Sequence, residues 1–319
     1  MSVQAWTSQE FHDGAREWVE RQVRSFGLEL ADGWTQPHVR HWSSTIRVTT
    51  STEPLWFKVN GVGTRHEAAV VQQLCARVPE LVPEVLAVDT GRGWSLSRDA
   101  GPMLREVLSA DRSGDAWEAV LTRYADAQVR LTGAADALLA AGLRDVSPAT
   151  VPVLARELLE DLATVPVPEG GLSAEDVVRI QRVLPRLDDW CAELAGSGVP
   201  DSIQHDDLHS GNICWDVASG TGRVIDWGDA SWGFPLGTML VTLNTVPATQ
   251  ALRLRDAYLD AFTRYADRAR LVRCVDLARR TGCVAKALAW RAALLDVPLR
   301  DQEELDFPVR AWLLELLDY

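Results

Sequence analysis

A cluster of polar residues between positions 202 and 212 has the composition needed for phosphoryl transfer. It reads SIQHDDLHSGN, so His205 precedes Asp207 by two positions and Asn212 follows Asp207 by five. Asp226 comes 14 positions after Asn212 and begins the run Asp226-Trp227-Gly228. A kinase active site has the same order: H-x-D, four residues, Asn, and later an Asp that is followed by an aromatic residue and Gly.

The residue types suit the parts of this reaction. Phosphoryl transfer needs a carboxylate that orients and deprotonates the attacking hydroxyl, and oxygen ligands for the Mg²⁺ that bridges the phosphates. Asp207 is the candidate catalytic base, and Asn212 and Asp226 are the candidate metal ligands. His205 belongs to the same catalytic loop, where we expect it to hold the loop by hydrogen bonds. An Asp on a loop is usually a cap or a solvated turn, so the prediction depends on the joint spacing.

The lysines give an independent indication of a nucleotide site. Only two of the 32 basic residues are lysines, Lys58 and Lys286. Arg supplies the ordinary positive charge, so a retained Lys is expected where a compact ammonium group is needed. A kinase uses a Lys on its third strand to hold the phosphates and a helix carboxylate to position that Lys. Lys58 and Glu67 fit these places, with Glu84 a competing carboxylate and an exposed strand position the plain alternative for Lys58.

The first 100 residues predict the small sheet that positions Lys58. Runs rich in β-branched and aromatic residues predict an antiparallel meander over Val39–Trp42, Thr45–Thr50 and Leu55–Val59. A helix over Glu67–Arg77 and strands over 84–88 and 94–97 follow. Lys58 therefore lies on the third strand of the predicted sheet.

Two segments of the sheet are predicted to bind the nucleotide. Ser43 and Ser44 are expected in the turn between the first two strands, where a protein kinase has its glycine-rich loop. Ser97 and Asp99 flank the start of a hinge over 98–102 and are assigned to the cofactor on position alone. Backbone groups there would face the edge of an adenine ring.

The rest of the chain is predicted to be mainly helical, apart from the polar island at 201–229. Helices are expected near 103–109, 115–141, 151–162, 173–196, 236–246, 249–267, 270–292 and 308–318. The fold class is therefore α+β with two lobes. Residues 1–98 are predicted to form a small antiparallel β-sheet N-lobe, and residues 99–319 a larger helical C-lobe whose catalytic loop spans 203–229.

Composition excludes several classes of protein. The chain of 319 residues carries a net charge of −13, so it lacks the basic surface that nucleic acid or an anionic membrane would attract. No apolar run is long enough to cross a bilayer, and the first residues do not resemble a secretory signal. The five cysteines form no C-x-x-C pair. We expect a cytoplasmic protein, monomeric or homodimeric.

These motifs resemble the aminoglycoside phosphotransferase / choline kinase-like group of small-molecule kinases. The group's hallmark is similar to H-x-D-L-H-x-x-N at 205–212, I-D-W at 225–227 and A-x-x-G-x-P at 230–235. The resemblance implies a protein-kinase-like fold that uses ATP and Mg²⁺. It implies Asp207 as base, Asn212 and Asp226 as metal ligands, and Lys58 with Glu67 as the nucleotide clamp.

The chain departs from its expected relatives at a few positions. The family usually has Asp where Phe234 stands and another near Gly237; we interpret those Asp residues as structural braces. No G-x-G-x-x-G loop occurs near Ser43 and Ser44, and no activation segment fits between Asp226 and the helix predicted near Pro235. Both observations argue against a protein kinase.

The acceptor is predicted to be a small molecule with a hydroxyl group. Residues 101–319 carry 11 more acidic than basic side chains, which favours a cationic or sugar-like acceptor such as an aminoglycoside or aminosugar. Choline-like amino alcohols and neutral sugars are alternatives, and the role could be antibiotic resistance or metabolism. The candidate acceptor contacts are Asp256, Asp260, Glu303, Glu304, Asp306, Trp232 and Trp290, although most of these carboxylates are expected to be solvated and the tryptophans to lie in the core.

Two other classes of function compete with this interpretation. His205, Asp206, Asp207 and His209 are four potential metal ligands in five residues, as in a metal-dependent hydrolase, but neighbouring loop positions point in different directions. A kinase fold that only binds ligands usually lacks the Lys, the base Asp, the Asn or the metal Asp, and all four are present here.

Overall fold

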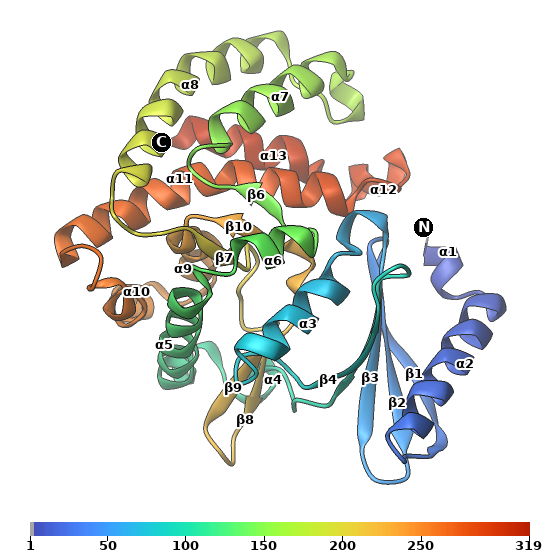
Figure 1. Ribbon diagram of the computed structural model, residues 1–319. Coiled ribbons are helices and arrows are strands. Elements are labelled where there is room, and N and C mark those ends of the chain that lie inside the picture. The colour runs from blue at the N-terminus through green and yellow to red at the C-terminus, as the bar shows by residue number, and fades with distance from the viewer. Residues whose placement is uncertain (1–2) are drawn as a thin grey trace.

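The computed structural model describes residues 3–319, and its N-terminal part is a five-stranded antiparallel sheet (Figure 1). The strands are β1 Leu30–Val39, β2 Ser43–Thr50, β3 Pro54–Asn60, β4 Val85–Asp89 and β5 Trp94–Arg98. Their order in the sheet is β1-β2-β3-β5-β4. Lys58 lies on the central strand, β3, as predicted.

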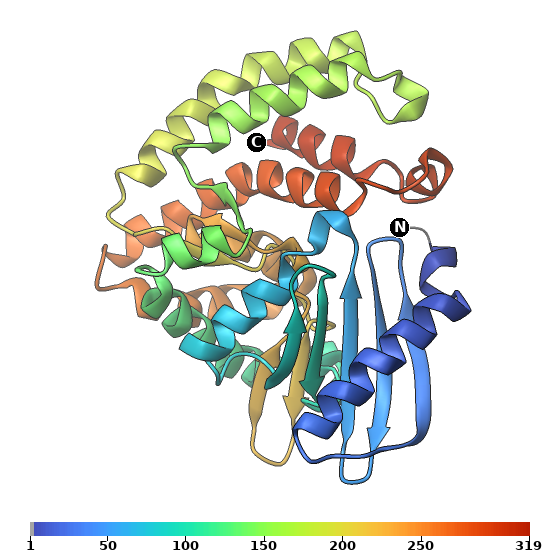
Figure 2. The ribbon, with the colours of Figure 1, turned by 45° about the vertical axis from the view of Figure 1, so that its right-hand side comes forward.

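One face of this sheet is covered by the N-terminal helices α1, Val3–Trp6, and α2, Gln9–Ser25 (Figure 2). Alternate residues of β3, such as Leu55, Phe57 and Val59, are fully buried against this cover. Because side chains alternate between the faces of a strand, Lys58 must lie on the opposite face. The apolar face thereby anchors the strand that presents the lysine.

The first strand differs from the prediction. A strand was expected over Val39–Trp42, but β1 ends at Val39 and begins nine residues earlier at Leu30. The structure accommodates Gly33 and Pro37 in β1, which is an edge strand with two register shifts against β2. Consequently Ser43 and Ser44 belong to β2 and do not form the turn, which is made by residues 40–42.

The remainder of the chain is mainly helical. The helices are α3 Glu67–Arg77, α4 Leu104–Val107, α5 Gly114–Leu131, α6 Ala135–Ala140, α7 Val151–Thr164, α8 Ala174–Ala195, α9 Met239–Thr245, α10 Ala248–Leu259, α11 Arg268–Ala293, α12 Leu299–Glu304 and α13 Pro308–Leu314. The single helix expected over 115–141 is wrong, because α5 ends at Leu131 and α6 begins four residues later. Helix α12 was not predicted.

Short 3₁₀ turns connect several of these elements. They are η1 Val62–Thr64, η2 Ala110–Arg112, η3 Val167–Glu169, η4 Trp227–Asp229, η5 Pro235–Thr238, η6 Asp260–Phe262 and η7 Glu315–Asp318. The turn η4 follows directly on Asp226, so it begins inside the predicted catalytic island. The combination of an antiparallel sheet and a helical region confirms the predicted α+β, two-lobed fold class, while the boundary at residue 98 stays a prediction.

The island at 201–229 forms small sheets inside the helical lobe. Strand β7, Ser202–Gln204, pairs antiparallel with β10, Ser231–Gly233, which also pairs with the unpredicted β6, Arg144–Val146. Strands β8, Ile213–Asp216, and β9, Thr221–Val224, form a hairpin. The loop 205–212 therefore joins two short strands.

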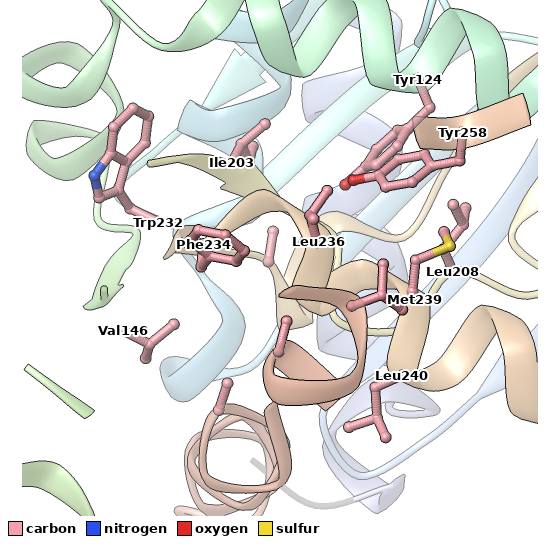
Figure 3. Packing of buried hydrophobic residues seen from close by; sticks show 14 of the residues in the cluster. Tyr124, Val146, Ile203, Leu208, Trp232, Phe234, Leu236, Met239, Leu240 and Tyr258 are labelled. Atoms are coloured by element: carbon pink, nitrogen blue, oxygen red, sulfur yellow. The ribbon is translucent and has the colours of Figure 1, made fainter. Parts of the chain in front are cut away.

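A continuous apolar core supports this island. Ile203, Leu208, Leu236 and Tyr124 lie together in it, and all four are fully buried (Figure 3). Burial of a large aliphatic side chain contributes about 1.5–3 kcal/mol. The loop thus rests on a packed base, which fixes the path of its backbone. Within residues 3–319, no helix combines the length and apolar composition that membrane crossing requires.

Candidate active site

Lys58 joins the N-lobe sheet to the island of the C-lobe. Its Nζ lies 2.8 Å from Oε1 of Glu67, at the start of α3, and 2.5 Å from Oδ1 of Asp226, at the end of the hairpin. Burial alone would lower the pKa of Lys58, but the charges of Asp226 and Glu67 outweigh it and raise that pKa. The predicted pair of Lys58 and Glu67 is therefore in contact, together with the predicted metal ligand Asp226.

Glu67 is held by further donors. Its Oε2 accepts a hydrogen bond of 2.9 Å from Nδ2 of Asn60, and its Oε1 accepts one of 3.0 Å from the backbone N–H of Trp227. The Glu67 carboxylate thus connects β3, α3 and the turn after Asp226. The competing residue Glu84 instead forms an ion pair with Arg98.

The backbone on both sides of the island adopts a left-handed conformation. Asp206 has φ of 59° and Asp226 has φ of 66°. Such a conformation costs about 1–3 kcal/mol for a residue other than Gly, and it persists where the surroundings enforce it. The sharp turn at Asp226 directs its side chain toward Lys58, and the turn at Asp206 places Asp206 and Asp207 in different environments.

The side chain of His205 holds the loop, because both of its ring nitrogens are hydrogen-bonded to backbone groups. Its Nε2 lies 2.8 Å from the carbonyl oxygen of Ile225, so this nitrogen carries the proton and donates, while Nδ1 accepts from the N–H of Asp207 at 3.3 Å. The ring is fully buried, and burial lowers the pKa of His205. The structure therefore matches the expectation that His205 positions the loop.

Asp207 is surrounded by donors. Oδ1 accepts from Nζ of Lys286 at 2.7 Å, while Oδ2 lies 3.4 Å from Nε2 of His209 and 3.3 Å from Nδ2 of Asn212. Burial on its own would raise the pKa of Asp207, but the hydrogen bond from His209 and the charge of Lys286 hold that pKa well below its ordinary value. Asp207 is therefore ionised at neutral pH, which the predicted role of a base requires.

Asn212 and Asp226 are suitable for Mg²⁺ by the chemistry of their free ends. The amide nitrogen of Asn212 donates to the carbonyl oxygen of Asp207 at 2.9 Å, which leaves the amide oxygen as the end available to a cation. The Asp226 side chain is 47% exposed and its carboxylate has one oxygen on Lys58. Hard oxygen ligands of this kind are those that Mg²⁺ prefers. The donor set therefore fits the ion.

The four-residue metal cluster of the hydrolase alternative does not converge. His205 is directed to Ile225, whereas Asp206 accepts a hydrogen bond from the Ser231 hydroxyl. Among the side chains of these four residues, only those of Asp207 and His209 contact each other. The side chains of His205 and Asp206 thus bind neighbouring segments of the protein and do not point to a common metal position.

The predicted nucleotide residues of the sheet fall into two groups. Thr45 and Ser95 lie opposite Lys58 in the neighbouring strands, and Ser43 and Ser97 lie two positions along from them, so all four are on the face of Lys58. Ser44 lies on the other face, where its hydroxyl donates to the carbonyl oxygen of His38 at 2.9 Å. Ser44 therefore does not face the Lys58 side of the sheet.

Asp99 shapes the hinge. Its Oδ1 accepts a hydrogen bond of 2.8 Å from the backbone N–H of Gly101, which has a φ of 92°. This turn leads the chain from β5 toward α4. The hinge role of Asp99 thus has a geometric basis, and its contact with a nucleotide remains a prediction.

Three residues around Asp207 were missed by the sequence analysis as site residues. Lys286 and Asp229 form an ion pair of 2.7 Å, and His209 contacts Asp207. The scarcity of lysine that singled out Lys58 applied equally to Lys286. His209 stands within the same motif as Asp207, but the sequence analysis considered it only as a metal ligand of the hydrolase alternative.

The proposed acceptor contacts are mostly engaged elsewhere. Asp256 pairs with Arg255, and Asp260 pairs with Arg268. Trp232 is buried in β10, and Trp290 packs edge-to-face on Trp42 with ring centroids 5.4 Å apart. Glu303, Glu304 and Asp306 are exposed on or just after α12.

Comparisons with known proteins show that the fold of this chain occurs in several solved structures. Solved structures of similar fold include macrolide 2′-phosphotransferase MphH from Brachybacterium faecium, with 15% identity, a TM-score of 0.59, and coverage of 93% of this chain and 98% of that one. The GDP and kanamycin complex of APH(2″)-IIia has 16% identity and a TM-score of 0.60, with coverage of 95% and 97%. A choline/ethanolamine kinase family protein from Mesorhizobium loti has 18% identity and a TM-score of 0.57, with coverage of 90% and 92%.

Comparisons of the sequence give fewer matches than comparisons of the structure. No curated protein is similar enough in sequence to count as a match. The model of the phosphotransferase enzyme family, however, matches residues 34–272, which include Lys58, Glu67, Asp207, Asn212 and Asp226. This match spans most of the chain and confirms the resemblance found from the motifs. The chain therefore belongs to the phosphotransferase enzyme family.

Proposed function

We propose that this enzyme transfers the γ-phosphoryl group of Mg·ATP to a hydroxyl group of a small molecule. The observation that carries the proposal is the contact of Lys58 with both Glu67 and Asp226, next to a loop that presents Asp207. In the proposed site Lys58 is the cation for the phosphates, Asn212 and Asp226 are the oxygen ligands for a metal, and Asp207 is the carboxylate base. These are the parts that phosphoryl transfer requires.

Each residue has a defined task in the proposed reaction. Lys58 contacts the phosphates of ATP, and Asn212 and Asp226 hold Mg²⁺. When bound there, Mg²⁺ supplies charge neutralisation on the phosphate oxygens. Asp207 orients the acceptor hydroxyl and takes its proton as the oxygen bonds to the γ-phosphorus, while the bond from that phosphorus to the β-phosphate oxygen breaks and ADP leaves.

The acceptor is proposed to be a cationic or sugar-like molecule such as an aminoglycoside or aminosugar, with amino alcohols and neutral sugars as alternatives. Proteins of similar fold include a complex with kanamycin, a macrolide 2′-phosphotransferase and a choline/ethanolamine kinase family protein. Two of the acidic residues first considered for a cation, Asp256 and Asp260, give this choice no added support, because they are paired with arginines.

A panel assay tests the proposal. Release of ADP is measured with Mg·ATP and with Mg·GTP against aminoglycosides, macrolides, aminosugars, choline-like amino alcohols and neutral sugars. We expect one class to stimulate turnover, and Asp207→Ala to reduce that turnover by about 10²–10⁴-fold while Mg·ATP still stabilises the protein. A matched control is Asp216→Ala, since Asp216 lies in the same island but faces solvent.

The outcomes separate the alternatives. Full turnover by Asp207→Ala would exclude this carboxylate as the base. Stabilisation by Mg·ATP without turnover on any acceptor would favour a binding module. Hydrolytic activity that needs a divalent metal and no nucleotide would favour the hydrolase class.

A further inference from the structure

Both lysines of this chain are placed at the site, although only Lys58 has a role in the proposed reaction. Lys286 lies on α11 and reaches the base of the site from the C-lobe side. Its Nζ is 2.7 Å from Oδ1 of Asp207 and 2.7 Å from Oδ2 of Asp229. One ammonium group thus bridges the catalytic loop and the turn η4.

We propose that Lys286 is a positioning residue that fixes the carboxylate of Asp207 in its catalytic orientation, and that Asp229 holds Lys286 in place for this task. The inference rests on the proposed function, in which Asp207 receives the acceptor proton. It adds a residue that lies 79 positions from Asp207 along the chain and outside all the motifs.

The contacts of the two carboxylate oxygens of Asp207 show what Lys286 adds to the orientation of this side chain. His209 and Asn212 both approach Oδ2, and both belong to the same loop as Asp207. Neither contact ties the carboxylate to an element outside this loop. Lys286 contacts the other oxygen, Oδ1, from a long helix packed into the core, so it fixes the carboxylate relative to the body of the lobe.

The surroundings of Lys286 argue for a purpose beyond packing. Its side chain is only 5% exposed, and its neighbours on α11 include the buried Ala285, Ala287 and Leu288. Burial of an ion pair contributes little net stability compared with apolar residues of similar volume. A lysine retained in such an apolar stretch is therefore costly unless the charge serves the site.

The residue type fits a bridge of this kind. The ammonium group is a compact point charge with three donors, so a single nitrogen can contact two carboxylates from different segments. The planar guanidinium of Arg is suited to a bidentate pair with one carboxylate. This chain uses Arg for 30 of its 32 basic residues, yet a Lys stands here.

The other charged groups nearby do not replace Lys286. Asp206 lies next to Asp207 but accepts its hydrogen bond from Ser231. Arg144 donates to the carbonyl oxygen of Leu288 at 2.7 Å, so its nearest partner is the backbone of α11. Within residues 3–319, Lys286 provides the only ion pair to Oδ1 of Asp207.

The test compares steady-state kinetics of the wild type, Lys286→Met and Asp229→Asn. The assay follows ADP release from Mg·ATP with the best acceptor of the panel, or with water as acceptor. A misplacement of about 1 Å can cost a factor of about 100, so we expect Lys286→Met to lower kcat about 100-fold with the KM for ATP unchanged. Asp229→Asn is expected to lower kcat less, because Lys286 keeps its contact with Asp207.

Rescue distinguishes a positioning role from a merely structural one. In Lys286→Ala, added methylammonium or ethylammonium is expected to restore part of kcat, whereas tetramethylammonium at the same ionic strength is not, because it has no N–H to donate. Arg273→Met is the matched control, since it removes a cation from the same helix at a site paired with Glu193 on the surface.

The double variant Lys286→Met/Asp229→Asn guards against a folding failure, because it removes the positive and one negative charge together. Its kcat is expected to match that of Lys286→Met, as Asp229 acts only through Lys286. A folded Lys286→Met or double variant with the kcat of an active wild type would overturn the inference alone. A wild type without any turnover would overturn it together with the proposed function.

Discussion

The ammonium group of Lys58 and the carboxylate of Asp226 lie 2.5 Å apart, although 168 positions separate them in the sequence. This contact connects the N-lobe sheet directly to the C-lobe island. Lys58 is 17% exposed at its side chain, whereas Asp226 is 47% exposed, so the carboxylate faces the open side of the pair. An incoming Mg²⁺ would share Asp226 with Lys58, which links phosphate binding to metal binding.

Removal of the Lys58 charge is expected to impair catalysis strongly. Lys58→Met should lower kcat/KM for ATP by about 10²–10³-fold, because a charge that stabilises the transferring phosphoryl group is lost. Lys58→Arg should also be damaging, since the larger planar guanidinium does not reproduce the compact ammonium group between Glu67 and Asp226. Steady-state kinetics with varied ATP measures both effects.

The control for these variants is Arg16→Met. Arg16 lies on α2, on the far side of the sheet, where it pairs with Glu20 on the surface. Arg16→Met removes a positive charge from the N-lobe away from the site, so it should leave kcat/KM unchanged. Equal losses in Arg16→Met and Lys58→Met would mean that net charge, and not the position of Lys58, determines the rate.

Asn212 is expected to set the requirement for metal. Asn212→Ala removes the amide oxygen that is left for a cation, so the Mg²⁺ concentration for half-maximal turnover should rise at least tenfold. Titration of Mg²⁺ at saturating ATP measures this change. Asn244→Ala is the control, because the Asn244 side chain contacts Arg279 on the surface. An unchanged Mg²⁺ requirement in Asn212→Ala would remove Asn212 from the set of ligands.

Asp206 is expected to make stability depend on pH. Burial raises the pKa of this carboxyl group to about 7, above its ordinary value. Between that ordinary value and about pH 7 the folded protein therefore holds a proton that the unfolded chain has released. The free energy of unfolding should accordingly fall as pH rises through this window, by at most about 1.4 kcal/mol per pH unit from this group.

The variant Asp206→Asn isolates this contribution. An amide does not titrate, so the stability of the variant relative to the wild type should increase from pH 5 to pH 8. Chemical denaturation at a series of pH values measures the difference. A constant difference between the two proteins across this range would show that Asp206 has the same pKa in the folded and unfolded states.

The sequence analysis found residues that the structure brings into contact where a local pattern specifies them. Asp207, Asn212 and Asp226 stand at fixed spacings in one segment, and Lys58 stands on an apolar strand whose alternation determines its face. Lys286 was missed because no local pattern joins α11 to the loop. The contact arises only when the helical lobe packs, and the only signal in the sequence was the rarity of lysine.

The errors in the sheet also have a physical cause. Gly33 and Pro37 are typical of turns, but Pro is tolerated in an edge strand and β1 is the edge. A Cβ on Gly33 would lie 2.3 Å from Oγ1 of Thr49, so glycine is required by the close approach of β2. The turn predicted at Ser43 and Ser44 is wrong because both residues pair with β3, Ser43 opposite Asn60 and Ser44 opposite Val59.

The hydroxyl of Tyr124 is expected to stabilise the catalytic loop by a hydrogen bond to the loop backbone. It accepts a hydrogen bond of 2.9 Å from the backbone N–H of His205 and lies 3.1 Å from Oγ1 of Thr238, and all three residues are buried. Tyr124→Phe leaves that N–H without a partner, which costs about 1–3 kcal/mol. His205 in turn accepts a hydrogen bond from the backbone N–H of Asp207, so kcat should fall along with the melting temperature.

Differential scanning calorimetry measures the melting temperature of Tyr124→Phe, and ADP release measures its kcat. Tyr265→Phe, on a less buried tyrosine, is the control. A loss of stability with an unchanged kcat would mean that the loop keeps its shape without this hydrogen bond.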